Sequence, residues 1–287
     1  MKHLIVGPAG HGVTEYALGL ARATGAEVIR EETFGDSPLT GPVHVTFTDH
    51  LFGDTAERLL TRIDGPLSVS LHDIPQPEEG AERYARRARV YRELVEKADV
   101  AVVNSNHEAS FFDGNTTVIR LPIPVIDSPF NPEEGTVGVL GFLYPGKGHE
   151  DLIEALPDST LRFLGAVSKG HETWAENLEA DITGWLSDAQ LAHEMGRIAH
   201  PVCPHRHFSA SGSLMAWLGA GRTVLVRDSD YAREIDAWLP GRVTLVGDGG
   251  WREAVDRHEP KRIDPPRYGW AEVAQLWEET WRLAGLM

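Results

Sequence analysis

The stretch from Thr136 to Leu156 reads TVGVLGFLYPGKGHEDLIEAL, and it gives the clearest indication of how the chain folds. It begins with a short apolar run typical of a buried strand. A Gly/Pro turn with a single lysine follows, and the stretch ends in the pattern of an amphipathic helix. The first N–H groups of a helix have no partner within it, and the helix dipole favours an anion there. The stretch therefore predicts a strand–turn–helix unit with an anion-binding turn.

A second stretch, His205 to Val226, has a related order: HRHFSASGSLMAWLGAGRTVLV. A basic and aromatic loop leads into a Ser/Gly turn that opens a helix, and a glycine stop precedes another apolar strand. Both stretches place small residues and positive charge where a helix begins. Two such turns in one domain predict that a diphosphate is held between them.

The composition is that of an ordinary globular protein, and 287 residues fit two domains better than one. The net charge of −16 argues against a nucleic-acid-binding surface, which needs a basic face. An anionic ligand must therefore be bound by local cations and backbone dipoles against an unfavourable overall field.

Cys203 is the only cysteine, so no intrachain disulfide can form and a reducing compartment is expected. No apolar run approaches the roughly 18 residues of a membrane span, and we recognise no signal peptide. We therefore expect a cytoplasmic protein without a transmembrane segment. Peripheral membrane contact stays open, because the arginine-rich helix pattern 82–97 suits either an anionic lipid surface or a solvated face with internal ion pairs.

Strand and helix patterns alternate along the chain, which predicts parallel βαβ units. The strand patterns are His3–Val6, Glu27–Ile29, Val43–Phe47, Leu67–Leu71, Val100–Val103, Thr117–Leu121, Val137–Gly141, Leu161–Gly165, Asp181–Gly184, Val202, Val224–Val226 and Val243–Val246. Prolines interrupt the alternation over 122–135, and we place an interdomain linker at 124–135. It separates an N-terminal Rossmann-like domain, 1–123, from a second one, 136–268. Polar residues that follow these strands are expected at the ligand-binding edge of each sheet.

Several motifs occur in a recognisable order. They are Gly141-x3-Pro145-Gly146-Lys147-Gly148-His149-Glu150, Thr183-Gly184-Trp185-Leu186-Ser187-Asp188 and Ser211-Gly212-Ser213-Leu214, with Leu71-His72-Asp73-Ile74-Pro75 and a Gly-rich turn through Gly12 in the first half. In this order the chain resembles the retaining GT-B glycosyltransferases of family 4 (glycosyl transferases group 1). The resemblance implies two Rossmann-like, doubly wound parallel-sheet domains facing a central cleft. The first would bind the acceptor and the second the nucleotide-sugar donor, and the last helix, 269–287, would pack back on the first domain.

Two features depart from that family. Its relatives carry a pair of glutamates seven residues apart, whereas the corresponding window 206–217 contains no acidic residue. The arginine that often precedes the lysine is also absent, with Phe142 or Tyr144 near its position. Donor recognition is therefore altered or lost. A non-catalytic or divergent GT-B-like protein that binds a nucleotide or glycan stays open as the alternative.

The resemblance implies catalytic roles for His72, Lys147 and Arg206. Lys147, between two glycines at a turn with little side-chain cover, would neutralise the leaving diphosphate; the alternative is a solvated lysine. Arg206 would add a bidentate phosphate contact, or else belong to a surface turn with His205 and His207. His72 would position the sugar or act in acid–base chemistry, unless it is a strand-end histidine bonded to backbone.

The donor-binding residues implied by the same motifs are Gly12, Gly146, Gly165, Gly184, Trp185, Ser211, Gly212, Ser213 and Leu214. Gly184 and Trp185 would flank the base, and Ser211 to Leu214 would offer N–H groups to phosphate, although Ser-Gly-Ser is also an ordinary helix cap. The turn at Gly12 matches neither the dinucleotide fingerprint nor a P-loop, and a plain tight turn is its alternative.

No metal or cofactor is expected beyond the donor itself. His200, His205 and His207 lie near Cys203, but Pro201 and Pro204 interrupt any regular ligand spacing. The predicted function is metal-independent, retaining transfer of a sugar from a nucleotide-diphosphate sugar to the hydroxyl of a small-molecule, glycan or lipid-linked acceptor. An epimerase or a phosphorylase of the same architecture is a further alternative.

Overall fold

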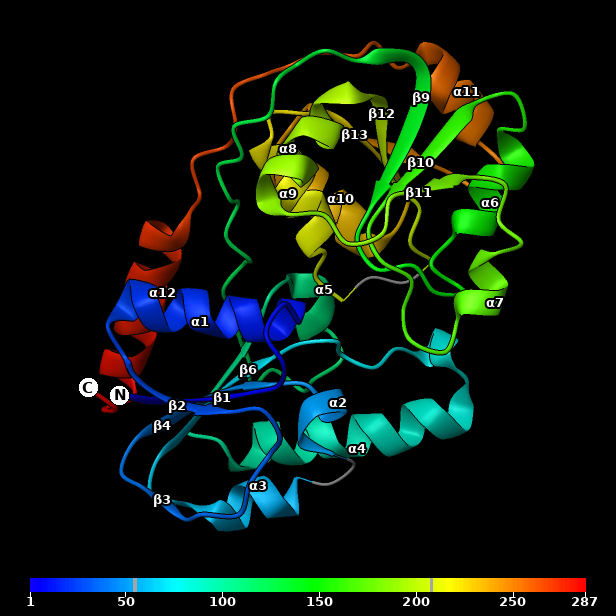
Figure 1. The fold of residues 1–287 in the computed structure, drawn as a ribbon. Helices are drawn as coiled ribbons and strands as arrows, with labels where there is room; N and C mark the ends of the chain where they lie inside the picture. The colour runs from blue at the N-terminus through cyan, green and yellow to red at the C-terminus, as the bar shows by residue number, and fades with distance from the viewer. Residues whose placement is uncertain (54–55, 207–208) are drawn as a thin grey trace. The chain divides into compact units, whose positions relative to one another are not determined.

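The computed structural model describes residues 1–53, 56–206 and 209–287. The chain divides into two compact units. Unit 1 comprises Met1–Pro122 and Tyr268–Met287, and unit 2 comprises Ile123–Arg267. Each unit contains a six-stranded parallel sheet with helices on both faces (Figure 1). The predicted fold class, two doubly wound parallel-sheet α/β domains, is confirmed.

The unit 1 sheet has its strands in the order β2-β1-β4-β6-β7-β8, and every pair is parallel. In chain order these strands are β1 (Lys2–Val6), β2 (Glu27–Glu31), β4 (Val43–Phe47), β6 (Leu67–Leu71), β7 (Val100–Val103) and β8 (Thr117–Val118). Two short strands, β3 (Leu39–Thr40) and β5 (Ile63–Asp64), pair separately. The direction of winding reverses between β1 and β4, so a topological switch point lies there.

Helices cover both faces of this sheet (Figure 1). They are α1 (Gly12–Thr24), α2 (Asp49–Phe52), α3 (Glu57–Arg62), α4 (Ala81–Lys97), α5 (Asn106–Ala109) and α12 (Trp270–Leu283), with a 3₁₀ turn η1 (Pro77–Glu79). One apolar core joins the sheet to α2, α3 and α4. The other joins it to α1 and α12, where the Trp277 indole N–H donates to the Tyr16 hydroxyl at 3.3 Å.

The sheet face under α1 and α12 is polar although it is buried. His3 and His44 are both 0% exposed. The His3 ring is hydrogen-bonded to Thr46 Oγ1 at 3.0 Å and the His44 ring to Ser68 Oγ at 2.9 Å, while Trp281 Nε1 donates to the same serine. Burial lowers the pKa of His3 to about 3, and burial followed by neighbouring histidines lowers that of His44 well below its usual value. We call His3, His44 and His72 the histidine layer.

The unit 2 sheet has the order β11-β10-β9-β12-β13-β14, again all parallel. Its strands are β9 (Glu133–Leu140), β10 (Thr160–Leu164), β11 (Asp181–Ile182), β12 (Ile198–Cys203), β13 (Val224–Arg227) and β14 (Val243–Val246). The switch point lies between β9 and β12. The sequence showed only Val202 of β12, because Pro201 lies within this central strand, whose pairing with β9 shifts in register between Ile198 and His200.

The unit 2 helices also cover both sheet faces (Figure 1). They are α6 (His149–Ala155), α7 (Glu172–Ala175), α8 (Asp188–Arg197), α9 (Gly212–Gly219), α10 (Asp230–Trp238) and α11 (Trp251–Arg257). An apolar core joins α6, α7 and α11 to one face, and α8, α9 and α10 lie on the other. None of the helices within the described residues combines the length and apolar character needed to cross a membrane.

The segment 123–132, at the start of the proposed linker, has neither helix nor strand, and β9 begins at Glu133. It packs closely on helices α8 and α9 of the same unit. A Cβ added at Gly196 would lie 1.7 Å from the Pro129 carbonyl oxygen, and one added at Gly219 would lie 1.7 Å from that of Pro124. The absence of a side chain at these two helix positions therefore lets the segment lie against the two helices.

Candidate functional site

The unit 2 switch point is flanked by two loops, one following β9 and one following β12. These loops touch. A Cβ added at Gly148 would lie 2.2 Å from the Pro204 carbonyl oxygen, and Gly148 has a φ of +94°, which favours glycine. Open α/β sheets bind ligands at this place, so both segments singled out in the sequence lead to one site.

Lys147 is buried, which corrects the expectation that it has little side-chain cover; it is 6% exposed. Its Nζ donates to the Phe142 carbonyl oxygen at 2.8 Å and to that of Leu140 at 3.3 Å. Nζ lies only 2.9 Å from where a Cβ on Gly141 would be. The missing side chain at Gly141 thus makes room for the ammonium, while Gly146 at φ +87° shapes the turn.

The Lys147 ammonium has no carboxylate partner within the described residues. Burial lowers its pKa to about 8, and the nearby Cys203 opposes this effect. His149 lies beside it with a fully buried ring, and burial together with the lysine charge lowers the pKa of His149 to about 3. The histidine is therefore neutral, and one uncompensated cation is left for an anionic ligand.

The N-terminus of α9 faces the same place. Ser211 caps the helix, since its Oγ accepts from the Leu214 N–H at 3.2 Å, while the Ser211 N–H donates to the Tyr231 hydroxyl. Within the described residues, the N–H groups of Gly212 and Ser213 have no acceptor, and the first turn of α9 carries no acidic residue. This helix end therefore favours an anion.

Gly141 is where the lysine and the helix meet. Besides lying 2.9 Å from Lys147 Nζ, its Cβ position is 4.0 Å from Ser213 Cβ. Gly165 completes this corner, because a Cβ there would lie 2.3 Å from the Gly141 carbonyl oxygen, and the Gly165 N–H donates to Thr183 Oγ1 at 3.1 Å. The structure thus brings Gly146, Lys147, Gly165 and the Ser211–Leu214 turn together.

Arg206 lies in the loop after β12 but its guanidinium is bound. It pairs with Asp151 of α6 at 2.6 Å and is half exposed. The other oxygen of Asp151 binds Arg227, and the Arg206 hydrogen bond lowers the pKa of the Asp151 carboxyl. Arg206 is therefore anchored beside the site by a carboxylate that the sequence did not reveal. Its neighbour His207 lies outside the described residues.

Gly184 and Trp185 follow β11 at the same edge of the sheet. Gly184 has a φ of +70°, and Trp185 is 66% exposed. The Trp185 ring lies 6.2 Å from that of Phe142, which is also exposed and follows β9. Two exposed aromatic rings on adjacent loops can stack on a planar ligand.

His72 belongs to unit 1, where its ring is buried. Its Nε2 is hydrogen-bonded to Ser70 Oγ at 2.9 Å, and Tyr16 packs on it with ring centroids 4.6 Å apart. Burial, with a smaller contribution from His11, lowers the pKa of His72 to about 3. The ring is therefore neutral at pH 7. Its geometry matches the strand-end histidine that was the alternative, though with a side-chain partner in place of backbone.

Gly12 begins α1, and this helix end differs from that of α9. The Gly10 N–H donates to the carboxylate of Glu15, in the first turn, at 2.9 Å. A phosphate placed here would meet a like charge. The turn at Gly12 is therefore poorly suited to bind donor phosphate.

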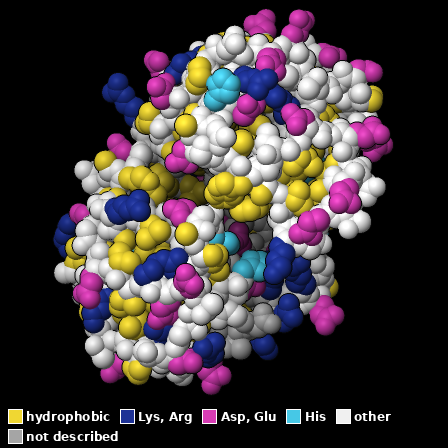
Figure 2. All heavy atoms as spheres, viewed as in Figure 1, with side chains coloured by type: hydrophobic (Ala, Val, Ile, Leu, Met, Phe, Trp, Pro, Cys, Tyr) yellow, Lys and Arg dark blue, Asp and Glu magenta, His cyan; other side chains and the backbone are white. Residues whose placement is uncertain are grey.

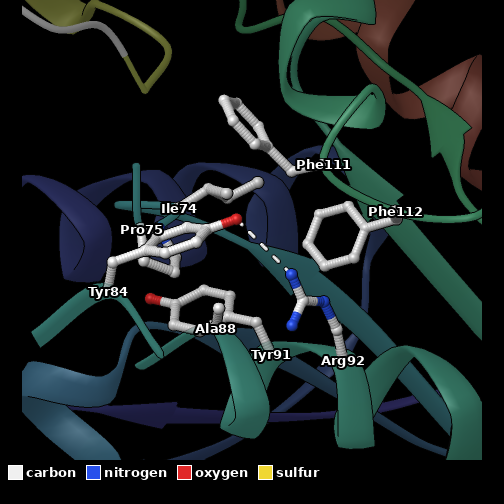
Figure 3. A pocket seen from close by; sticks show the side chains of 8 residues that line it. All are labelled: Ile74, Pro75, Tyr84, Ala88, Tyr91, Arg92, Phe111 and Phe112. Carbon is white, nitrogen blue, oxygen red and sulfur yellow. Dashed lines mark hydrogen bonds between the residues drawn. The ribbon is translucent and has the colours of Figure 1, made fainter. Parts of the chain in front are cut away.

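Two hollows within the described residues lie away from the unit 2 switch point. One, in unit 1, is bordered by Ile74, Pro75, Tyr84, Ala88, Tyr91, Arg92, Phe111 and Phe112 (Figure 3). Arg92 Nη2 donates to the Tyr84 hydroxyl across it at 3.4 Å. Its volume of about 10 Å³ fits a single water molecule. Another, of about 200 Å³, lies in unit 2 beside Pro129, Asn131, His193, Gly196 and Arg197. Gly196 and Arg197 precede β12, so this hollow lies at the opposite edge of the sheet.

Charged side chains of both signs are spread over the visible surface, with Asp and Glu side chains between those of Lys and Arg (Figure 2).

The sequence analysis did not identify Gly141, Asp151, Arg227 and Cys203 as parts of the site at the unit 2 switch point. Gly141 alone carried a signal, since it ends the strand pattern and begins the glycine-rich turn motif. The other three are brought in by tertiary packing.

Two parallel-sheet α/β units of this kind have the fold of the GT-B glycosyltransferases. HepE of Anabaena, solved in complex with UDP-glucose, has a TM-score of 0.76 and 17% identity, with 99% of this chain and 100% of that chain covered. Sucrose-phosphate synthase of Thermosynechococcus elongatus has a TM-score of 0.67 and 13% identity over 100% and 97% of the two chains. The lipopolysaccharide outer core galactosyltransferase WaaB has a TM-score of 0.62 and 10% identity over 98% and 99%. No known protein family and no curated protein matches the sequence.

Proposed function

We propose that the protein is a retaining, metal-independent glycosyltransferase that uses a UDP-sugar as donor and a hydroxyl compound as acceptor. One observation carries the proposal: the Lys147 ammonium and the free N–H groups of α9 meet beside Gly141 at the unit 2 switch point. An uncompensated buried cation and a helix N-terminus without acidic residues suit a diphosphate.

The chemistry follows from that placement. When the bond between the sugar and the diphosphate breaks, negative charge develops on the phosphate oxygens. Lys147 and the α9 N–H groups would be held in advance where that charge develops, and such preorganised stabilisation is usually the largest catalytic term. With a protein cation in this position, the proposed reaction needs no metal ion at the diphosphate.

UDP is the nucleotide we propose because HepE, which has the same fold, was solved with UDP, with UDP and glucose, and with UDP-glucose. Gly184 and Trp185, with Phe142 opposite, would receive the base by stacking, which contributes about 1–3 kcal/mol per base. Arg206 would reach the phosphates by exchanging Asp151 for the ligand, and His72 would orient the sugar as a neutral ring.

The test is calorimetric titration of UDP, UDP-glucose and pyrophosphate into the wild type and Lys147→Met. The methionine keeps the length of the side chain and removes its charge. Loss of a charge-assisted phosphate contact, about 1.5–3 kcal/mol, should weaken UDP binding roughly ten- to a hundredfold. Lys261→Met, at an exposed lysine of the same unit, should bind as the wild type does.

The pH dependence gives an independent reading of the same lysine. Because the free pKa of Lys147 is about 8, UDP affinity should fall about tenfold between pH 7 and pH 9 as the ammonium is lost. The loss should vanish in Lys147→Met. If UDP, GDP, ADP and their glucose conjugates all fail to bind the wild type, the proposed function is wrong.

A second candidate function is binding without transfer. The window 206–217, which includes the start of α9, contains no acidic residue, so the glutamate pair of the family that this chain resembles is missing. UDP release from UDP-glucose, with and without EDTA and with a panel of sugar acceptors, separates the two. Release that EDTA does not change, with an α-linked product by NMR, supports the transferase, whereas tight binding without release supports the second candidate.

A further inference from the structure

The switch point of unit 1 carries a different set of side chains from that of unit 2. The loop after β1 ends at His11. Thr48 follows β4, and His50 lies next in the short helix α2. The neighbouring strand β6 ends before Asp73. Because β1, β4 and β6 are adjacent, their carboxyl ends place these side chains at one edge of the sheet.

Asp73 is the one non-glycine residue with a positive φ, +51°, within the described residues. This left-handed conformation costs a non-glycine residue of the order of 1 kcal/mol and persists only where the surroundings impose it. Aspartate tolerates it better than most residues, but a glycine would carry no such cost. The position thus keeps a carboxylate where a plain turn would favour glycine.

Hydrogen bonds hold the Asp73 backbone in place. Arg87 Nη2 donates to the Asp73 carbonyl oxygen at 2.7 Å, and the Tyr91 hydroxyl donates to the preceding carbonyl, that of His72, at 2.7 Å. Arg87 itself is balanced by the carboxylates of Asp49 at 2.7 Å and Glu79 at 2.5 Å. The buried arginine therefore holds the turn without using the Asp73 carboxylate as its counterion.

The Asp73 side chain is exposed, and one of its oxygens is fixed. Thr48 Oγ1 donates to Oδ2 at 3.1 Å. The other oxygen, Oδ1, has no hydrogen-bond partner within the described residues. His11 lies close enough to both Asp73 and His50 for their charges to act on it. Burial lowers the pKa of His11, the Asp73 carboxylate opposes this shift, and His50 adds to it.

We propose that Asp73, with His11 near it and His50 near His11, binds the acceptor: Oδ1 accepts the hydrogen bond of a hydroxyl on a sugar or another polyol. A carboxylate is a strong acceptor for such hydroxyls, and a hydrogen bond to a charged group is worth about twice a neutral one. The imidazoles of His11 and His50 can donate to or accept from adjacent hydroxyls of the same polyol. This inference rests on the proposed glycosyltransferase function, for which it names the acceptor class and its residues.

The test compares Asp73→Asn with the wild type. Asparagine tolerates positive φ and can still accept the Thr48 hydrogen bond, so the turn should keep its shape while the charge is lost. The matched control is Asp113→Asn, which removes an exposed carboxylate elsewhere in unit 1. Asp73→Gly is the second variant, because it relieves the backbone and lacks the side chain altogether.

The readouts are thermal unfolding, UDP affinity by calorimetry, and the initial rate of UDP release from UDP-glucose in water and with glucose or glycerol added. Asp73→Asn and Asp73→Gly should fold, bind UDP within twofold of the wild type and release UDP to water at the wild-type rate. With glucose or glycerol added, they should release UDP at least tenfold more slowly than the wild type does. The polyol concentration needed for half-maximal stimulation should rise in both variants. Asp113→Asn should match the wild type in every readout.

Two outcomes overturn the inference while leaving the proposed donor site intact. One is release by Asp73→Asn within twofold of the wild-type rate when glucose or glycerol is added. The other is a wild type that binds UDP-glucose but releases no UDP to water or to either polyol. A wild type that binds neither UDP nor UDP-glucose refutes the proposed function itself, and the inference with it.

Discussion

Units 1 and 2 have the same kind of open parallel sheet, but their switch points differ in charge. In unit 2, α9 begins without an acidic residue, and Lys147 beside it has no carboxylate partner in the part of the chain that the structure describes. In unit 1, α1 carries Glu15 in its first turn and Asp73 lies exposed nearby on the edge of the sheet. Sheet topology determines where a ligand binds, and a few side chains at the start of the next helix determine which charge it carries.

The largest expected effect concerns acid stability. The histidine layer of unit 1 contributes to it, and His149 of unit 2, whose pKa burial also lowers, contributes as well. A histidine whose folded pKa is below 6.5 binds its proton only in the unfolded state as pH falls from 6.5 toward 3, so stability is full above 6.5 and is lost below it. Each such proton costs about 1.4 kcal/mol per pH unit once the unfolded histidine is protonated, so His3 and His72 together amount to about 5 kcal/mol between pH 6.5 and 4.5, and His44 adds to this loss.

Urea unfolding measured across this pH range checks the expectation. His44→Phe should reduce the slope of unfolding free energy against pH by about one proton, whatever it does to stability at pH 7. Equal slopes for the variant and the wild type would show that His44 is not kept neutral by burial.

The next largest effect concerns stability and tests the contact between the two loops of unit 2 at Gly148. Gly148→Ala should lower the free energy of unfolding by about 3 kcal/mol, because the new Cβ meets the Pro204 carbonyl oxygen in addition to the strain of a positive φ. Gly146→Ala is the control: it has a similar φ but open space at its Cβ, and should cost only about 1–2 kcal/mol. Chemical denaturation compares them, and equal losses would contradict a tight contact between the two loops.

A charge swap then makes unit 2 resemble unit 1. Ser213→Glu places a carboxylate in the first turn of α9, as Glu15 does in α1, and should weaken UDP binding by about 2 kcal/mol or more, at least thirtyfold. Ser213→Gln matches the size without the charge. If both variants bind UDP equally well by calorimetry, the charge at this helix end does not select the ligand.

The smallest effect is the reverse experiment in unit 1. Glu15→Gln removes the carboxylate at the start of α1 and should lower the unfolding free energy by less than about 1 kcal/mol, since one charge–dipole interaction at a helix end is lost. UDP affinity should stay as in the wild type. A change in that affinity would mean that α1 also contacts the donor.

The sequence predicted the alternation of strands and helices, because hydrophobic periodicity and Gly/Pro turns are local properties. It did not predict the extent of β12, where Pro201 hides a central strand, or the polar sheet face that carries His3 and His44. The environment of His3 and His44 forms only when α12 packs against the sheet, and Trp281 of that helix is 213 positions beyond its partner Ser68.

At the site, the sequence placed Lys147 and the Ser211–Leu214 turn at helix starts, which is again a local signal. It misjudged the burial of Lys147, since the space for Nζ depends on Gly141 and on packing against a second loop. It also did not predict that the Arg206 guanidinium is paired with a carboxylate, because Asp151 lies 55 positions away in the sequence. The roles of the site residues stay predictions until the binding experiments are done.

Cys203 ends β12 beneath Lys147 and is 1% exposed, and burial raises the pKa of its thiol to about 12. Alkylating reagents need a thiolate that they can reach, so this sulfhydryl should react only when unit 2 opens locally. Because it is the sole thiol of the chain, its labelling rate reports how often the structure around the base of the candidate site opens. A ligand that stabilises the closed form of this region should therefore slow the labelling of Cys203.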